Sequence, residues 1–139
     1  MLDSPSPKAL RTLIVDDEPL ALERMELICR DLAMIEVAGT AQDGAAALQA
    51  IGELAPDLVL LDMTMPELDG LAVARALTRQ DDAPAVIFVT AHDNFAVEAF
   101  DLEAVDYVLK PVTPERLERA VARAIARRLR VARRDVGFG

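Results

Sequence analysis

Residues 13–19 read LIVDDEP, and this short stretch contains the change of pattern that decides the fold. Leu13–Val15 is a continuous apolar run bounded by polar residues, which is typical of a strand buried on both faces. The acidic turn leads into Pro19, a residue well suited to the first turn of a helix. The pattern continues to Arg30 with apolar and polar side chains at helical spacing. A buried strand followed at once by a helix is the repeating unit of α/β proteins.

The same strand–helix unit repeats four more times along the chain. Further strands are expected at residues 34–39, 58–61, 85–89 and 105–109. The helices that follow them are expected at residues 43–51, 69–78, 94–101 and 114–134. The second of the five helices is expected to end before Gly52, and the apolar residues that indicate the first helix include Leu20 and Leu27. Five such units predict a doubly wound (βα)₅ domain, with a parallel sheet and helices on both of its faces.

Length and composition limit the class of protein. The chain has 139 residues, 53% of them hydrophobic and 28% charged, which fits one folded domain. No run of about 18 apolar residues exists, so no membrane-spanning helix is expected, and the first ten residues lack the pattern of a secretory signal. Cys29 is the single cysteine, which excludes an internal disulfide. A reducing, cytoplasmic location is therefore expected.

Charge is distributed unevenly along the chain. Residues 1–114 hold 7 basic and 21 acidic residues, whereas residues 115–139 hold 8 arginines and 3 acids. The acidic part repels nucleic acid over most of its surface. We therefore divide the chain into a flexible lead-in at residues 1–10, a folded domain at residues 11–126, and an arginine-rich helical extension or linker at residues 127–139.

Chemically useful side chains follow the expected strands. Asp16 and Asp17 follow the first strand, Asp62 follows the third, Thr90 follows the fourth and Lys110 follows the fifth. In a parallel sheet these ends meet at one edge, where ligands bind. Three carboxylates in one cleft repel one another, and a hard cation such as Mg²⁺ relieves that repulsion. With a lysine and a hydroxyl beside them, they form a site suited to a phosphoryl group, in which a carboxylate can act as the nucleophile.

Two other functions fit the same architecture less well. A flavin or nucleotide binder needs a first loop rich in glycine, serine or threonine that donates backbone N–H groups to phosphate, but the loop here is acidic. A Mg²⁺-dependent phosphatase with an aspartyl nucleophile has the pattern Asp-x-Asp, and Asp62-Met63-Thr64 lacks the second acid. Visible absorbance would test the first function, and hydrolysis of a phosphomonoester the second.

Four segments together resemble the receiver domain of two-component response regulators. They are VDDEPLA (15–21), LVLLDMTMPELDG (58–70), FVTA (88–91) and DYVLKP (106–111). The resemblance covers roughly residues 11–126. A narrower stretch, AHDNFAVEAFDLEAVDYVLKPV (91–112), is similar to receivers that precede LytTR-type DNA-binding domains. The resemblance implies a flavodoxin-like receiver fold with a five-stranded parallel sheet in the order 2-1-3-4-5.

The resemblance also implies a role for each matching residue. Asp62 would be the phosphoacceptor. Mg²⁺ would be bound by Asp16, Asp17, Asp62 and the backbone carbonyl of Thr64. The residues that hold the phosphoryl group and switch conformation would be Thr90, Lys110 and Tyr107. A cis peptide bond would join Lys110 to Pro111, and Thr64 and His92 would tune dephosphorylation.

The implied function is a phosphorylation-operated switch rather than an enzyme, apart from its own phosphorylation and dephosphorylation. Its partners would be a sensor histidine kinase, or a phosphotransfer protein, and a second copy of the chain in a dimer that phosphorylation strengthens. The dimer surface would join the fourth helix, fifth strand and fifth helix, with acidic side chains that include Asp106. Nucleic acid would be bound only through a LytTR-type output domain absent from this chain. The alternative is a stand-alone receiver that acts by protein–protein contact. Phe95 and Phe100 are expected to pack between helix and sheet, and the alternative is that they are anchors of an interface.

Overall fold

The computed structural model describes residues 9–136, and for residues 131–136 it describes the backbone alone. The chain alternates strictly between strands and helices. The strands are β1 (Leu10–Val15), β2 (Ile35–Ala41), β3 (Leu58–Leu61), β4 (Ala85–Thr90) and β5 (Asp106–Leu109). The helices are α1 (Pro19–Arg30), α2 (Gly44–Leu54), α3 (Gly70–Leu77), α4 (Ala96–Asp101) and α5 (Pro114–Val136).

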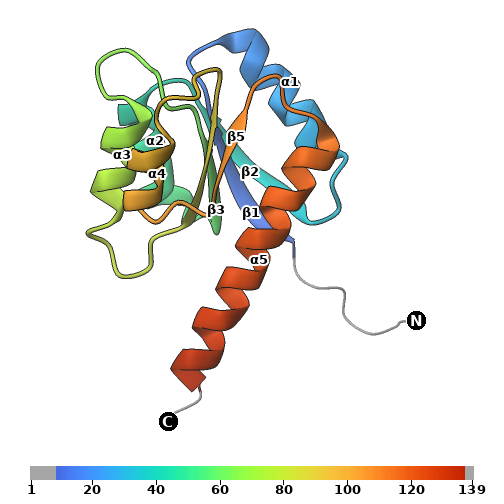
Figure 1. Ribbon diagram of the computed structural model, residues 1–139, viewed down its shortest axis with the longest axis vertical. Coiled ribbons are helices and arrows are strands. Elements are labelled where there is room, and N and C mark those ends of the chain that lie inside the picture. The colour runs from blue at the N-terminus through green and yellow to red at the C-terminus, as the bar shows by residue number, and fades with distance from the viewer. Residues whose placement is uncertain (1–8, 137–139) are drawn as a thin grey trace.

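The five strands form one parallel sheet in the order β2-β1-β3-β4-β5. Helices α1 and α5 cover one face of the sheet, and α2, α3 and α4 cover the other (Figure 1). This arrangement confirms the doubly wound (βα)₅ fold and the strand order that the resemblance implied. Since every strand runs in the same direction, all five carboxyl ends lie at one edge of the sheet.

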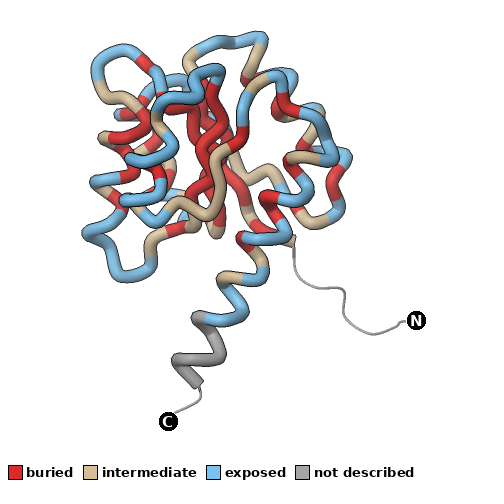
Figure 2. Tube along the Cα trace, viewed as in Figure 1, coloured by how far each residue is buried: buried red, intermediate tan, exposed pale blue. Residues whose placement is uncertain are grey.

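The central strands are apolar along their whole length because both of their faces are covered. All four residues of β3 are buried, as are Leu13, Ile14 and Val15 of β1 (Figure 2). Alternate side chains enter two separate cores, one under α1 and α5 and one under α2, α3 and α4. Continuous apolar runs, rather than alternating ones, are what a sheet between two helical layers requires.

Helix α1 does not turn Leu20 and Leu27 toward the sheet, although both belong to the apolar pattern that indicated the helix. Leu22, Met25 and Cys29 are buried at helical spacing, whereas Leu20 and Leu27 are 76% and 62% exposed. Burial raises the pKa of the Cys29 thiol to about 12, and the nearby negative charge of Glu26 adds to this effect. The thiol therefore stays protonated inside the core.

Two predicted helix features differ from the structure. Helix α2 continues through Gly52 to Leu54, because a glycine inside a helix costs only about 1 kcal/mol and Ile51 is anchored in the core. The prediction that Phe100 packs against the sheet is wrong, since this side chain is 82% exposed on α4. Ala99 is the buried residue of that helix instead.

The two ends of the chain bear on the predicted domain limits. Strand β1 already includes Leu10, which falls within the segment predicted as a lead-in, and residues 1–8 lie outside the described residues. Helix α5 continues beyond Ala126 to Val136, and residues 137–139 lie outside the described part. The division at residues 126 and 127 stays a prediction. Among the helices that the structure describes, none is both long and apolar enough to cross a membrane.

Candidate functional site

The carboxyl edge of the sheet brings together the side chains that the sequence singled out. Asp16 and Asp17 directly follow β1, Asp62 directly follows β3, and Lys110 directly follows β5. Thr90 is the last residue of β4 and is fully buried. The backbone N–H of Lys110 donates to the carbonyl oxygen of Thr90 at 2.8 Å, so the ends of β4 and β5 are held side by side.

Asp62 lies at the centre of this edge and is only 5% exposed. One of its carboxylate oxygens accepts a hydrogen bond from the backbone N–H of Thr64 at 3.2 Å. The other lies 3.6 Å from the ammonium nitrogen of Lys110. The carboxylate is thus oriented from one side by its own loop and approached from the other by a cation.

Asp16 and Asp17 complete a tight group of carboxylates. One oxygen from each of Asp16, Asp17 and Asp62 lies within 4.8 Å of the other two. Asp16 is buried, accepts from the backbone N–H of Glu18 at 2.9 Å and forms an ion pair with Lys110 at 2.7 Å. The single ammonium group of Lys110 therefore lies between two of the three acids.

The titration of this cluster reflects burial and like charge. Burial is the main reason that the pKa of Asp62 is raised from 3.8 to about 6, and the charges of Asp16 and Asp17 raise it further. The attraction of Lys110 and the hydrogen bond from Thr64 act in the opposite direction without reversing the effect. For Lys110, burial alone would lower the pKa, but the hydrogen bond to Asp16 and the charge of Asp62 outweigh it and raise the pKa.

The cluster has the chemistry of a site for a hard divalent cation. Mg²⁺ prefers carboxylate and carbonyl oxygens, and it usually combines a few protein ligands with several waters. The three converging carboxylates supply such oxygens, and when ionised they carry more negative charge than the single ammonium group of Lys110 beside them can balance. The residues present therefore fit a magnesium ion.

Comparison with known protein families matches residues 12–122 to the response regulator receiver domain. That match covers most of the chain and includes all three acids, Thr90 and Lys110. The chain belongs to the response regulator receiver family.

The curated relatives of this receiver are longer proteins. It is 50% identical over 116 residues to the positive alginate biosynthesis regulatory protein of Pseudomonas aeruginosa, an alignment that covers 83% of this chain and 47% of that protein. It is 39% identical over 112 residues to the sensory transduction protein LytR of Staphylococcus haemolyticus, covering 81% of this chain and 44% of that protein. The similarity to LytR agrees with the resemblance to LytTR-type receivers. The receiver spans less than half the length of these relatives.

Solved structures give the same result for the fold. The response regulatory domain of protein mrkE from Klebsiella pneumoniae superposes with a TM-score of 0.77 at 32% identity, covering 84% of this chain and 96% of that one. A receiver domain protein from Clostridium thermocellum gives a TM-score of 0.79 at 28% identity, covering 88% and 98% of the two chains. The flavodoxin-like receiver fold is thereby confirmed.

The hydroxyl groups of Thr90 and Tyr107 both bond to the backbone of the loop between β4 and α4. The Thr90 hydroxyl accepts from the backbone N–H of His92 at 3.2 Å. The Tyr107 hydroxyl donates to the carbonyl oxygen of His92 and accepts from the backbone N–H of Phe95 at 3.3 Å. Both side chains therefore contact the loop between β4 and α4. His92 itself is exposed, and its ring lies edge-on to Phe95 with a centroid separation of 6.2 Å.

The remaining predicted positions lie around the same loops. Thr64 is exposed directly beyond Asp62, and the peptide bond from Lys110 to Pro111 is cis, as the resemblance implied. The structure also adds a residue whose role the sequence did not reveal. A Cβ atom at Gly70 would lie 2.2 Å from the carbonyl oxygen of Asp62, so only glycine lets α3 begin against the loop that carries Asp62. The Asp-Gly pair at residues 69–70 is the sequence signal at this position.

Asp106 corrects one expectation about the surface. Its carboxylate accepts hydrogen bonds from the guanidinium group of Arg116 at 2.9 and 3.0 Å and from that of Arg123 at 2.8 Å, both within the same chain. Burial would raise the pKa of Asp106. The hydrogen bonds from Arg116 and from the backbone N–H of Tyr107, together with the charges of Arg116 and Arg123, outweigh burial and lower the pKa. Asp106 therefore joins β5 to α5 internally. It is not one of the free acidic side chains expected on a dimer surface, because α5 supplies its partners.

Proposed function

We propose that Asp62 is the phosphoacceptor of a two-component response regulator. A sensor histidine kinase, or a phosphotransfer protein, would present a phosphohistidine. The observation that carries the proposal is the setting of Asp62: two further carboxylates lie within 4.8 Å, and the Lys110 ammonium group lies 3.6 Å from an Asp62 oxygen. A buried carboxylate beside a cation and a metal-binding acid pair suits attack on an anionic phosphoryl group.

The chemistry follows from the positions of these groups. With a pKa of about 6, Asp62 is mostly ionised at pH 7, and its carboxylate attacks phosphorus as the bond to the histidine nitrogen breaks. Lys110 and the hydroxyl of Thr90 hold oxygens of the transferred group. The resulting acyl phosphate would later be cleaved by water, and the side chains of Thr64 and His92, both exposed, would control how water approaches.

Mg²⁺ is the proposed cofactor. Asp16, Asp17, Asp62 and the backbone carbonyl of Thr64 would hold it, and the bound ion would offset negative charge on the phosphoryl oxygens. No other catalytic activity is proposed for the chain beyond its own phosphorylation and dephosphorylation.

The conformational response would pass from Thr90 to Tyr107. Both hydroxyls bond to the backbone of the loop between β4 and α4, so movement of the Thr90 hydroxyl toward a phosphoryl oxygen changes the loop that Tyr107 contacts. A ligand can shift such an equilibrium only through different contacts in the two states. The loss of the His92 contact and the gain of a phosphoryl contact would provide that difference.

The output would be a dimer formed through α4, β5 and α5. Val97, Phe100 and Leu109 expose apolar surface there, while Glu98 and Asp101 supply negative charge for an arginine-rich α5. Dimerisation would control a LytTR-type DNA-binding domain outside this sequence, in line with relatives more than twice the length of the match. Nucleic acid would be contacted only by that domain, in the cytoplasm and away from the membrane. A stand-alone receiver that acts by protein contact is the alternative.

Intact-protein mass after incubation with phosphoramidate and Mg²⁺ tests the assignment. Wild-type protein should gain one phosphoryl group, and Asp62→Asn should gain none. Asp82→Asn, which alters an exposed aspartate, serves as the matched control and should be labelled like wild type. Asp17→Ala should lose labelling through loss of the metal. Equal labelling of wild type and Asp62→Asn would show that another residue accepts the phosphoryl group.

A further inference from the structure

Helix α5 is divided into a packed half and a projecting half. Leu117, Ala120, Val121 and Ala124 are all fully buried against the sheet. Ile125 is partly buried against the same core, and none of the side chains from residue 126 to residue 130 is buried. The helix nevertheless continues to Val136, and Figure 1 shows it extending past the end of the sheet opposite the acidic cluster. Apolar packing thus ends at Ile125, and it does not hold the projecting half, residues 126–136, against the body at residues 126–130.

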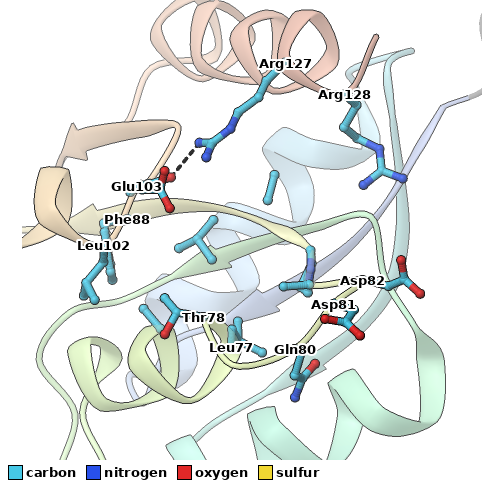
Figure 3. Close-up of a pocket in the computed structure, with 16 residues that line it drawn as sticks. Leu77, Thr78, Gln80, Asp81, Asp82, Phe88, Leu102, Glu103, Arg127 and Arg128 are labelled. Carbon is cyan, nitrogen blue, oxygen red and sulfur yellow. Dashed lines mark hydrogen bonds between the residues drawn. The ribbon is translucent and has the colours of Figure 1, made fainter. Parts of the chain in front are cut away.

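Two adjacent arginines make polar contacts with the body at the point where the projecting half begins. Arg127 donates to the backbone carbonyl oxygen of Glu103 at 2.5 Å. Arg128 lies 3.1 Å from the carboxylate of Asp57 and donates to its carbonyl oxygen at 3.4 Å. Figure 3 shows the two side chains leaving α5 in different directions, so the helix is attached to the body at two separate points.

The anchor of Arg128 belongs to the sheet. Asp57 precedes β3, its carboxylate accepts from the backbone N–H of Arg11 at 2.9 Å, and its N–H donates to the carbonyl oxygen of Arg11 at 2.8 Å. The carbonyl oxygen of Asp57 also accepts from the N–H of Ala85 at 3.0 Å. Asp57 thus joins the starts of β1, β3 and β4. Arg128 is therefore held by a residue that links three strands of the sheet.

The anchor of Arg127 belongs to α4. Glu103 has a φ of 60° and directly follows the C-terminal cap of α4. Its N–H donates to Phe100 at 2.9 Å, and the N–H of Ala104 donates to Ala99 at 3.1 Å, which is the bonding pattern of a Schellman motif. The carbonyl group that Arg127 binds is therefore fixed to the end of α4 and moves with it.

The two anchors differ in how firmly they are held. Helix α4 has six residues, of which Ala99 is buried, whereas the strands joined by Asp57 are buried throughout their centres. An open groove of about 550 Å³, lined by both arginines and by the ends of α3 and α4, separates α5 from these helices. A displacement of α4 can therefore move the anchor of Arg127 while that of Arg128 stays in place.

We propose that Arg127 and Arg128 together set the direction in which the projecting half of α5 leaves the domain, and that Arg127 transmits displacement of α4 to it. Arg128 acts as the fixed attachment to the sheet. Arg127 acts as the movable attachment, because it binds the turn that ends α4. The second part rests on the proposed function, since it assumes that phosphorylation of Asp62 displaces α4.

The attachment itself is tested without phosphorylation. Nitroxide labels at Gln49→Cys on α2 and Leu129→Cys on α5 report the distance between the body and the projecting half. Arg127→Ala and Arg128→Ala should each broaden the distance distribution and speed amide exchange at residues 125–136 by about two- to fivefold, the range expected from losing an exposed polar contact. Arg130→Ala changes another exposed arginine of α5 and should behave like wild type. Unchanged distributions in both variants would overturn the proposal.

The transmission is tested with beryllofluoride and Mg²⁺, which mimic the phosphoryl group. In the wild type the distance between the labels should shift. In Arg127→Ala the shift should disappear, although the single tyrosine still reports binding of the mimic at Asp62. In Arg128→Ala a shift should persist within a broader distribution. A wild-type shift retained in Arg127→Ala would refute transmission by this residue. If neither the tyrosine nor the labels of the wild type respond to the mimic, the result counts against the proposed function. The test of the two attachments, made without the mimic, keeps its result.

Discussion

Replacing Asp62 by asparagine should stabilise the metal-free protein at neutral pH. Asparagine keeps the size of the side chain and removes the charge that burial and the two neighbouring acids oppose. A group whose pKa is raised on folding binds its proton more tightly in the native state, so the ionised form lowers stability. This destabilisation is absent at a pH below the pKa of Asp62 in the unfolded chain, and it is complete at a pH above the pKa of Asp62 in the folded protein.

The structure gives the size of the effect. A pKa of about 6 in place of 3.8 corresponds to about 3 kcal/mol, because each unit is worth about 1.4 kcal/mol. The variant should therefore unfold with a free energy higher by about 2–3 kcal/mol at pH 7.5, where Asp62 is fully ionised. At pH 3.5, below the unfolded pKa, wild type and variant should have nearly the same stability.

Urea unfolding followed by circular dichroism measures this difference, in EDTA and then in Mg²⁺. In the proposed function the ion binds the folded state and stabilises the wild type more than the variant, so Mg²⁺ should narrow the difference in stability. Asp82→Asn removes an exposed aspartate and controls for the change in net charge; it should shift stability by less than about 0.5 kcal/mol at either pH. A variant that is less stable than wild type at pH 7.5, or a gain that persists at pH 3.5, would refute the reasoning.

Three further predictions concern separate parts of the fold. Gly70→Ala should lower the free energy of unfolding in urea by about 1–3 kcal/mol, because the new Cβ would meet the carbonyl oxygen of Asp62. Gly52→Ala should raise it by about 0.5–1 kcal/mol, because no atom lies within 4 Å of the new Cβ. Equal effects of the two substitutions would contradict the packing argument. Because the pKa of Asp106 is lowered, its ionised carboxylate stabilises the fold above the ordinary aspartate pKa, and this stabilisation is lost as pH falls. Asp106→Asn should therefore be less stable than wild type at pH 7 and similar to it at pH 2. A difference in stability that does not depend on pH would argue against the ion pairs. Thr90→Ala should still be labelled at Asp62 while the emission of the single tyrosine no longer changes on labelling, and an unaltered emission change would exclude Thr90 as the link.

The order of the elements could be predicted because the sequence carries strong local signals. Continuous apolar runs such as Leu58–Leu61 occur where a strand is covered on both faces, and the chain direction of a parallel sheet then brings its carboxyl ends together. Asp62, Thr90 and Lys110 could therefore be placed at one edge without coordinates. The same logic places Asp16, since it directly follows Val15.

Features that depend on tertiary contacts could not be predicted. Leu20 and Leu27 satisfy a helical apolar pattern, yet the face of α1 that meets the sheet is set by the crossing of the helix over the strands. Phe100 is apolar but lies on the outer face of a short helix. The pairing of Asp106 with Arg116 links β5 to the following helix, and no local pattern indicates which acids find an internal partner.

The buried position of Cys29 has a practical consequence for redox and labelling chemistry. Disulfide exchange and alkylation require an accessible thiolate, and this thiol is fully buried with a pKa of about 12. Air oxidation should therefore not cross-link native copies of the chain, and any dimer seen without reductant is held by noncovalent contacts. A cysteine introduced on the surface should be the single site that reacts with a maleimide or nitroxide reagent, so Cys29 can be left in place.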